Sequence, residues 1–310
     1  MFVSGWIDFV GAIGLILVGA VVYYPVRERT VRDGGDAAVT DRRSVAKTML
    51  SKVPEVTIYF WIIKVLCTTV GETFADFLNV NLGLGLSVTT YVMSAALAVA
   101  LAFQFRLYRY VPGVYWLVVV LVSIVGTLIT DNLSDNFGVP LWVSTIVFSV
   151  ALGVTFSAWY ASERTLSIHT IFTTKREAFY WLAILFTFAL GTAAGDLVSE
   201  GYGLGYWRSG ILFALVIGAV GFAYYRGANA VLTFWIAYIM TRPLGASIGD
   251  LMSQKHANGG FGLGTVWTSA LFLGTILALV VYLSVTRTDQ IETPEHSGSA
   301  SGSKDPGSPG

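Results

Sequence analysis

The chain has 310 residues and no net charge, so electrostatics give no reason to expect a nucleic-acid partner. Hydrophobic residues make up 55% of it and charged residues only 12%, against about 25% in a typical soluble domain. A single cysteine, Cys67, excludes an internal disulfide, and three scattered histidines form no metal cluster. No nucleotide-binding motif is present, and we expect no cofactor. The composition therefore favours an integral membrane protein.

The first predicted element is a membrane-spanning helix within residues 1–24. The run from Phe2 to Tyr24 is apolar and about 23 residues long, enough to cross a bilayer. It lacks a basic region and an A-x-A cleavage site, so we interpret it as a retained helix and not as a signal peptide. Residues 25–54 follow as a basic linker without apolar periodicity, which predicts a flexible cytoplasmic segment.

Residues 55–287 contain four copies of one pattern, [FY]-W-x9-G-x4-D, without gaps. Repeats of this kind indicate four equivalent structural units, which we bound at 55–110, 111–163, 176–226 and 229–287. The repeated tryptophans are Trp61, Trp116, Trp181 and Trp235. The repeated glycines are Gly71, Gly126, Gly191 and Gly245. The repeated aspartates are Asp76, Asp131, Asp196 and Asp250.

Each aspartate is followed by a short segment that ends in G-L-G or G-V-P, and then by a second apolar run. These second runs have about 20 residues, so each of them can also span a membrane. Each repeat is therefore predicted to be one transmembrane hairpin. The predicted fold is an all-α integral membrane bundle of eight repeat helices plus the N-terminal helix. The Ser/Gly/Pro-rich residues 288–310 predict a disordered tail.

Basic residues predict the orientation of the bundle. The linker, the connections between repeats and the tail together hold fifteen Lys and Arg, whereas the segments that follow the aspartates hold two. Lys and Arg are enriched on the cytoplasmic side of membrane proteins. We therefore expect a multi-pass plasma-membrane protein with its N-terminus outside, its C-terminus in the cytoplasm and the four aspartates near the outer surface.

Two stretches of the repeats, KVPEVTIYFWIIKVLCTTVGETFAD and MTRPLGASIGD, resemble a bacterial family of membrane proteins built from a repeat of unknown function. Members of that family are usually described as membrane-anchored proteins. The resemblance covers about residues 52–285 and implies a four-repeat architecture within the membrane. It implies no substrate and no mechanism, so function is argued from the residues.

Side chains that share a helix face with each aspartate form a polar stripe in steps of four residues. In the first repeat the stripe holds Lys64, Thr68, Glu72 and Asp76. In the fourth repeat it holds Arg242 and Asp250, and in the middle repeats Thr127 and Thr192 precede the aspartates. The glycines lie about 140° away around the helix, on a face suited to close helix packing. Ionisable groups in a span usually face the protein interior or a water-filled cavity.

The polar stripes favour a transporter or channel for a small cation, either a divalent metal ion or a proton, along a path lined by the aspartates. Oxygen ligands suit hard cations, and carboxylates also relay protons. The expected partners are the lipid bilayer and a small inorganic ion. An alternative is a small-anion transporter that uses Lys64 and Arg242, and another is a membrane scaffold without solute flux.

Simpler interpretations stand beside these. Each aspartate can serve only to end a helix near the interface, where a carboxylate costs little. The aromatic-Trp pairs are typical of the aromatic belts at membrane surfaces. The G-x-G-D element of intramembrane aspartyl proteases is incomplete at Asp196 and Asp250, so we do not expect an enzyme.

The cation at Arg242 needs a partner, because a bare charge in a span costs at least about 2.5 kcal/mol. Arg242 follows its tryptophan by seven residues, and Glu72 follows its own by eleven. On aligned helices the two differ by about 6 Å in depth, a gap that an extended arginine bridges. We therefore predict an ion pair between Arg242 and either Glu72 or Asp76.

Overall fold

The computed structural model describes residues 52–289, and within them every regular element is a helix. The predicted N-terminal helix (1–24), most of the linker (25–54) and most of the tail (288–310) lie outside these residues. The eight long helices are α3 (Ile58–Asp76), α4 (Leu86–Arg106), α5 (Pro112–Asp131), α6 (Leu141–Glu163), α7 (Thr174–Asp196), α8 (Tyr206–Tyr225), α9 (Ala230–Ser253) and α10 (Gly264–Thr286). Each is long and apolar enough to cross a membrane.

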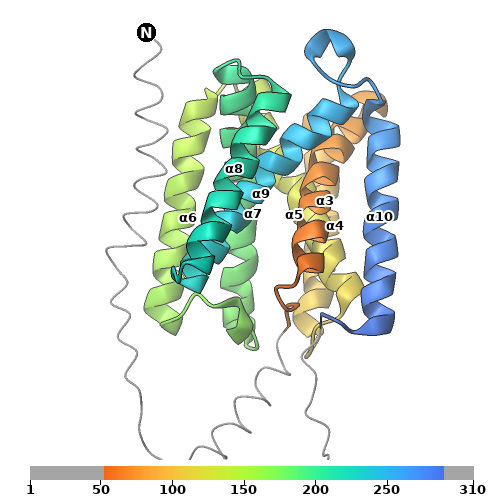
Figure 1. Ribbon diagram of the computed structural model, residues 1–310. Coiled ribbons are helices and arrows are strands. Elements are labelled where there is room, and N and C mark those ends of the chain that lie inside the picture. Colours follow the sequence, from red (N-terminus) through yellow and green to blue (C-terminus); the bar gives the residue numbers. More distant parts are fainter. Residues whose placement is uncertain (1–51, 290–310) are drawn as a thin grey trace, which may run out of the picture.

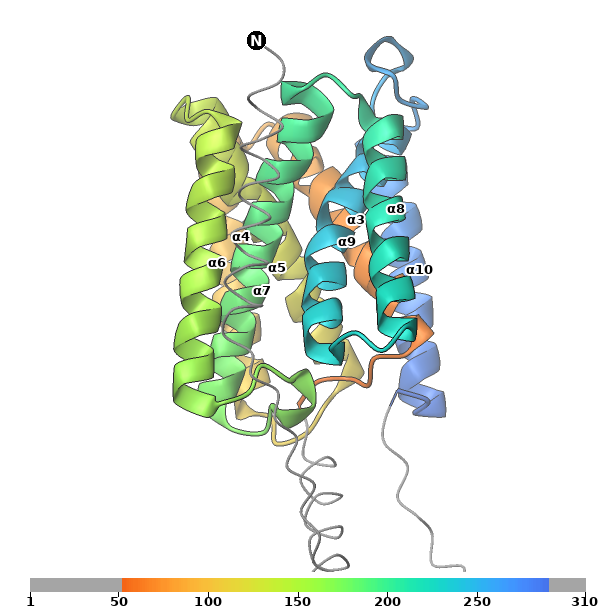
Figure 2. The ribbon, with the colours of Figure 1, turned by 60° about the vertical axis from the view of Figure 1, so that its left-hand side comes forward.

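The first helices of the four repeats form an inner ring. Helix α3 packs on α5, α5 on α7, α7 on α9, and α9 returns to α3. The four run in the same direction, from an end that carries the aromatic-Trp pairs to an end that carries the aspartates (Figures 1 and 2). We call these the tryptophan end and the aspartate end. The repeats are thus arranged around one axis between the inner helices.

The second helix of each repeat packs mainly on the inner helix of the next repeat. Helix α4 packs on α5, α6 on α7 and α8 on α9, while α10 closes the circle on α3. The two helices of one repeat make far less contact with each other. The predicted hairpins are therefore correct as connections along the chain, but their packing partners lie in the neighbouring repeat.

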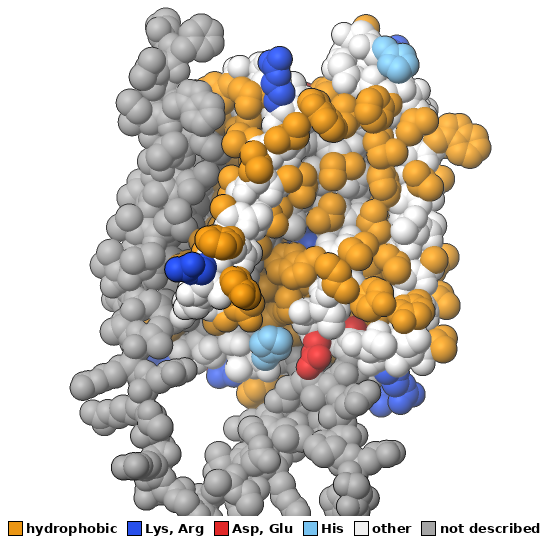
Figure 3. Space-filling model, in the orientation of Figure 1, with side chains coloured by type: hydrophobic (Ala, Val, Ile, Leu, Met, Phe, Trp, Pro, Cys, Tyr) orange, Lys and Arg blue, Asp and Glu red, His pale blue; other side chains and the backbone are white. Residues whose placement is uncertain are grey.

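Burial separates the two layers of helices. Within the apolar window of each inner helix, 61–72% of the residues are buried, against 11–33% in the outer helices α4, α6, α8 and α10. Apolar side chains cover the flank seen in Figure 3, and charged side chains on it are sparse and lie mostly toward its two ends. This surface is suited to lipid, because a hydrocarbon core supplies no partners for charges.

The inner helices begin at capping residues. The side chains of Thr57, Thr173 and Asn229 accept hydrogen bonds from the free backbone amides of α3, α7 and α9, respectively. Helix α5 instead begins with Pro112, which lacks the amide that would be unsatisfied at this position. Local sequence thus fixes where each inner helix starts.

The G-L-G motifs set the start of three outer helices. In each motif both glycines have positive φ; for example, Gly83 has 66° and Gly85 has 75°. Residues with a Cβ rarely adopt such angles. In the second repeat Gly138 has a φ of 64°, and Pro140 takes the position just before α6. The motifs therefore turn the chain back toward the membrane.

The segment after the aspartate is helical in three repeats, where the sequence predicted a short loop. One π-helical turn of five residues follows α3, α5 and α7, over Phe77–Asn81, Asn132–Asn136 and Leu197–Gly201. The wider π turn continues the helix and shortens the expected loop to the few residues around the G-L-G or G-V-P motif. In the fourth repeat, where more residues precede the G-L-G motif, α9 runs on to Ser253 and a 3-10 turn follows.

Both ends of the described chain are docked on the tryptophan end. Lys52 is buried, and its Nζ forms an ion pair with Glu177 at 2.6 Å and a hydrogen bond to the carbonyl of Phe105 at 3.2 Å. Asp289 is buried as well and accepts a hydrogen bond of 2.6 Å from Tyr110. The prediction of a flexible linker up to residue 54 and a disordered tail from residue 288 was therefore wrong at these residues.

Candidate functional site

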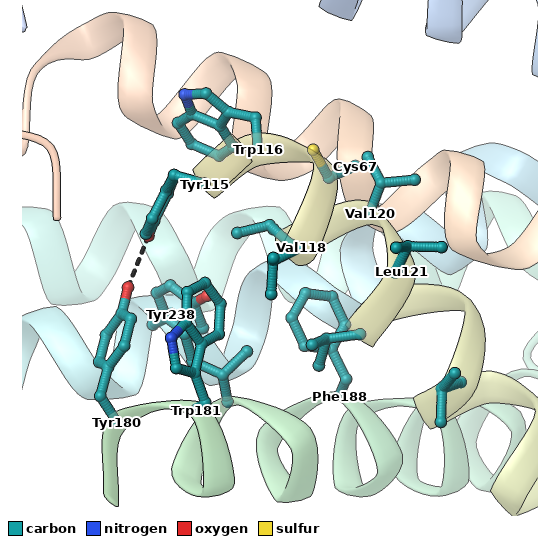
Figure 4. Close-up of a cluster of buried hydrophobic side chains, with 14 of the residues drawn as sticks. Cys67, Tyr115, Trp116, Val118, Val120, Leu121, Tyr180, Trp181, Phe188 and Tyr238 are labelled. Carbon is teal, nitrogen blue, oxygen red and sulfur yellow. Dashed lines mark hydrogen bonds between the residues drawn. The ribbon is translucent and has the colours of Figure 1, made fainter. Parts of the chain in front are cut away.

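The aromatic-Trp pairs of the four repeats form a closed aromatic ring around the axis. The aromatic residue of each repeat lies against the tryptophan of the next. The four contacts, between ring centroids, are Phe60–Trp116 at 5.7 Å, Tyr115–Trp181 at 5.5 Å, Tyr180–Trp235 at 6.4 Å and Phe234–Trp61 at 5.7 Å. A hydrogen bond of 2.5 Å joins the hydroxyls of Tyr115 and Tyr180 (Figure 4).

The prediction that these aromatic residues form a belt at the membrane surface was wrong. Six of the eight side chains are buried inside the protein, and only Trp61 and Phe234 are half-buried. Their large area and preference for tilted contacts explain why they pack on each other. The aromatic ring fills the space between the inner helices and so closes the axis at the tryptophan end.

Lys64 lies next to the aromatic ring, on the side toward the aspartates, and is fully buried. Its Nζ is 4.2 Å from the ring centroid of Phe188 and 4.1 Å from that of Tyr238. It also donates a hydrogen bond of 3.2 Å to Oγ1 of Thr241. Lys64 belongs to α3 and Phe188 to the opposite helix α7, so the lysine extends across the axis.

Arg242 is also fully buried and lies on the axis, nearer the aspartates than Lys64 does. Its guanidinium forms an ion pair of 2.7 Å with Glu72. It also donates to the carbonyl of Thr68 at 3.2 Å and to Oγ1 of Thr127. These acceptors belong to α3 and to α5, which is opposite α9. The predicted pairing of Arg242 with Glu72 is confirmed.

The repeated glycines lie where neighbouring inner helices approach most closely. A Cβ added to Gly71 would lie within 3.0 Å of Ser123, and one added to Gly126 would lie 2.7 Å from Cβ of Phe188. The corresponding contacts of Gly191 and Gly245 are with Arg242 and with Thr68, again within 3.0 Å. Each glycine thus faces the residue three positions before the next repeated glycine. The predicted packing role is confirmed, and the contacts show a cyclic order of repeats.

The four aspartates lie together at the aspartate end of the inner ring. Asp250 is buried, and the other three are half-buried. The charge of Asp131 interacts with those of Asp76 and Asp196, and the charge of Asp250 interacts with the same two. Glu72 interacts with all four. The four repeated aspartates and Glu72 therefore share one region at this end of the inner ring.

The aspartates do not act as helix caps. The side chains of Asp76, Asp131 and Asp196 make no capping hydrogen bond at the turns that follow them, and Asp250 lies inside α9. Within residues 52–289 none of the four forms an ion pair. Their carboxylates thus have no capping or ion-pair partner among the described residues, although α3, α5 and α7 do end at Asp76, Asp131 and Asp196.

The remaining predicted residues are structural in this conformation. The hydroxyl of Thr192 donates to the carbonyl of Phe188 at 3.1 Å, within α7. The hydroxyl of Thr68 lies 2.6 Å from the carbonyl of Val65 on its own helix and 3.2 Å from the carbonyl of Thr241 on α9, so it also links α3 to α9. Among the described residues no three His, Cys, Asp or Glu side chains are grouped closely enough to hold a metal ion.

Phe188, Tyr238 and Thr241 are parts of the site that the sequence did not single out. The first two share the polar stripe with the aspartates, at the same repeat positions as Thr68 and Lys64. Their place on the stripe was a usable signal, but their aromatic character gave no reason to expect a contact with a lysine of another repeat.

The fold and the site define a multi-pass α-helical membrane protein built from four repeats around one axis. The family model described as Repeat of Unknown Function (DUF347) matches residues 59–110, 114–165, 179–228 and 233–289. The chain belongs to this family, which confirms the resemblance seen in the sequence. No curated protein and no solved structure matches the chain significantly.

Proposed function

We propose that the protein moves a small cation across the membrane, with the four repeated aspartates as the entrance of its path. The observation that carries the proposal is their arrangement. Four equivalent carboxylates lie at one end of a closed ring of helices, without a cap or an ion pair among the described residues. Carboxylates kept within a membrane bundle without a structural partner are typical of ion and proton paths.

The ion pair of Arg242 removes one objection to a cation path and weakens the anion alternative. A free guanidinium on the axis would repel a cation, but Glu72 neutralises it at 2.7 Å. The same contact leaves only Lys64 to attract an anion. The four repeated aspartates and Glu72 outnumber the two basic side chains, Lys64 and Arg242, so the acidic groups of the inner helices support a cation or a proton as the solute.

A monovalent cation or a proton suits this site better than a divalent metal ion. Divalent ions need several oxygen ligands at about 2.0–2.6 Å. The described carboxylates are close enough to influence each other electrostatically, yet they form no such group. A proton needs only one carboxylate at a time and can pass along them.

We infer that the aspartate end faces outward in a plasma membrane and the tryptophan end faces the cytoplasm. The excess of Lys and Arg at the tryptophan end supports this orientation. The aromatic ring would then close the axis on the cytoplasmic side of the aspartates.

Flux in reconstituted vesicles tests the proposed function. Each repeated aspartate is changed to asparagine, which keeps the shape and removes the charge, and the flux of protons and of monovalent cations is followed. We expect each change to reduce flux at least tenfold. Asp135→Asn is the matched control, because Asp135 is an exposed carboxylate on the turn after Asp131.

Undiminished flux in all four variants would refute the aspartate path. A protein that folds but moves no cation, whatever the gradient, would favour the scaffold alternative. Flux of anions that depends on Lys64 would favour the anion alternative.

A further inference from the structure

We propose that Phe188, Tyr238 and Thr241 form an ammonium-binding site on the axis, which Lys64 occupies in this conformation and which accepts a free alkylammonium ion when Lys64 withdraws. The role of this site in transport rests on the proposed function. Its capacity to bind ammonium does not, because binding can be measured without flux.

The geometry is that of an aromatic cage. The Lys64 ammonium lies 4.2 Å and 4.1 Å from two ring centroids, within the range of favourable cation–π contacts. The oxygen of Thr241 donates its own proton to the carbonyl of Tyr238 at 2.7 Å, so its lone pairs are left to accept from Lys64. The cage thus offers two π faces and one hydrogen-bond acceptor, a set that matches an ammonium group.

The contacts of Lys64 are unusual for a buried cation, because no carboxylate takes part. Within residues 52–289 Lys64 forms no ion pair, and Glu72, the nearest acidic residue along its helix, is engaged by Arg242. The titratable and charged groups that interact with Lys64 are Cys67 on its own helix and Arg242 on α9. The cage therefore supplies the contacts that Nζ of Lys64 makes in this conformation.

The position of the cage gives it a role in the path. Lys64 and Tyr238 occupy one repeat position on the polar stripe and Phe188 the next, so all three face the axis. They lie between the aromatic ring and the Arg242–Glu72 pair. A cation that passes from the aspartates toward the tryptophan end has to pass this place, where a tethered ammonium now lies.

The chemistry of the cage selects among cations. Sodium and other metal ions need several oxygen ligands, and the cage supplies one. A quaternary ammonium satisfies the two rings but has no N–H for Thr241. A primary alkylammonium satisfies all three groups, as Lys64 itself does. The ligand class is therefore a small primary alkylammonium ion.

Chemical rescue tests the site in the purified full-length protein. Lys64→Ala removes Cγ, Cδ, Cε and Nζ, and n-propylammonium has the same four heavy atoms. We expect the variant to melt below the wild type and added n-propylammonium to raise its Tm by at least about 3 °C, because a ligand that binds only the native state stabilises it. Propan-1-ol, with the same size and no charge, should raise it by less than about 1 °C.

Control variants in the Lys64→Ala background link the rescue to the cage. Adding Phe188→Leu should abolish most of it, whereas Phe148→Leu, a buried aromatic change on α6 away from the axis, should leave it intact. Tetramethylammonium should rescue less than n-propylammonium. Absence of rescue in the folded variant, or equal rescue by propan-1-ol, would overturn the proposal.

A second measurement avoids the truncated variant, in case it does not fold. Phe188 is replaced by phenylalanines with one, two and three ring fluorines, which weaken the negative face of the ring and hardly change its size. A Tm that falls with each added fluorine when Lys64 is present supports the cage, provided that it does not fall in the Lys64→Met variant. An unchanged Tm throughout refutes it. Rescue in a protein whose aspartate variants keep full flux would leave the cage standing and remove the proposed path.

Discussion

Two ionisable side chains, those of Arg242 and Lys64, are buried inside the membrane-spanning bundle, where an uncompensated charge costs free energy. Arg242 and Lys64 solve the problem differently. Arg242 takes a carboxylate, a carbonyl and a hydroxyl, whereas Lys64 takes two aromatic rings and a hydroxyl. Both solutions use groups from several helices, so the charges depend on the assembled ring. We expect them to favour a single register of the ring, because a shifted helix would separate these groups from their partners.

The Arg242–Glu72 pair predicts a specific pattern of stabilities. Arg242→Gln and Glu72→Gln should each destabilise the protein by about 3–5 kcal/mol, since each leaves one buried charge alone. The double variant should lose clearly less than the sum. Thermal or denaturant unfolding in detergent measures all three. The combination of Arg242→Gln with Asp76→Asn is the control and should be closer to additive, and additive losses for both pairs would contradict the ion pair.

Asp289, outside the membrane spans, predicts a pH dependence. Burial raises the pKa of its carboxyl above the ordinary value, and the hydrogen bond from Tyr110 only partly offsets this. The folded protein therefore binds this proton more tightly than the unfolded chain does. The resulting stability is fully present below the unfolded pKa of about 3.9 and is lost as the pH rises through the folded pKa.

We accordingly expect Asp289→Asn to melt above the wild type at pH 7 and level with it near pH 4. Tm measured from pH 4 to pH 7 checks this. Tyr110→Phe, which removes the hydrogen bond and so raises the pKa of Asp289 further, should steepen the dependence. A difference between Asp289→Asn and the wild type that stays constant with pH would show that Asp289 does not titrate in this range.

The positions of residues along ideal helices explain why the Arg242–Glu72 ion pair could be predicted from the sequence and the aromatic cage around Lys64 could not. The depth of Arg242 and of Glu72 follows from their distances to a repeated tryptophan, so one pairing across two helices was within reach. The cage needs three helices at once. Without knowing that α7 lies opposite α3, nothing in the sequence connects Phe188 with Lys64.

At the scale of helices, the repeated pattern assigns a face to each inner helix but not its neighbour. Glycine spacing predicted a packing face, and the close contacts of Gly71 and Gly126 confirm it. The sequence could not predict which inner helix each outer helix packs on, because a short connection allows packing on the inner helix of the same repeat or of the next one. Burial of the small residues Thr89, Ser144 and Ser209 on outer helices became meaningful only once those partners were known.

Replacing glycine by alanine should have opposite effects on an inner helix and on an outer helix. Gly126→Ala places a Cβ 2.7 Å from that of Phe188 and 3.2 Å from the amide nitrogen of Ala189, so it should destabilise by about 1–3 kcal/mol. Gly153→Ala, in the middle of α6 with open space around it, should stabilise by about 0.5–1 kcal/mol. The Tm of each variant is compared with that of the wild type. Equal shifts in the two variants would argue against tight packing between the inner helices.

At the scale of the whole molecule, the alternating direction of eight spans puts all four aspartates on one side. Single cysteines at Asn79, Asn136 and Glu200 in a Cys67→Ala background should react with an impermeant thiol reagent in intact cells. Glu200 is preferable to its neighbour Ser199, which is buried. A cysteine at Ser162 should react only after the cells are opened, and the reverse pattern would invert the orientation.

The closed circle of repeats also bears on how such a chain could arise. Each unit presents one surface to the unit before it and a different surface to the unit after it, and such contacts close into rings. A gene for one hairpin would therefore already specify the whole bundle as a homotetramer. Four identical subunits, however, would bring four copies of Lys64 or of Arg242 to the same axis, where they would repel each other. Fusion into one polypeptide lets each copy diverge alone, and a single lysine, a single arginine and a single glutamate at the centre are what that freedom permits.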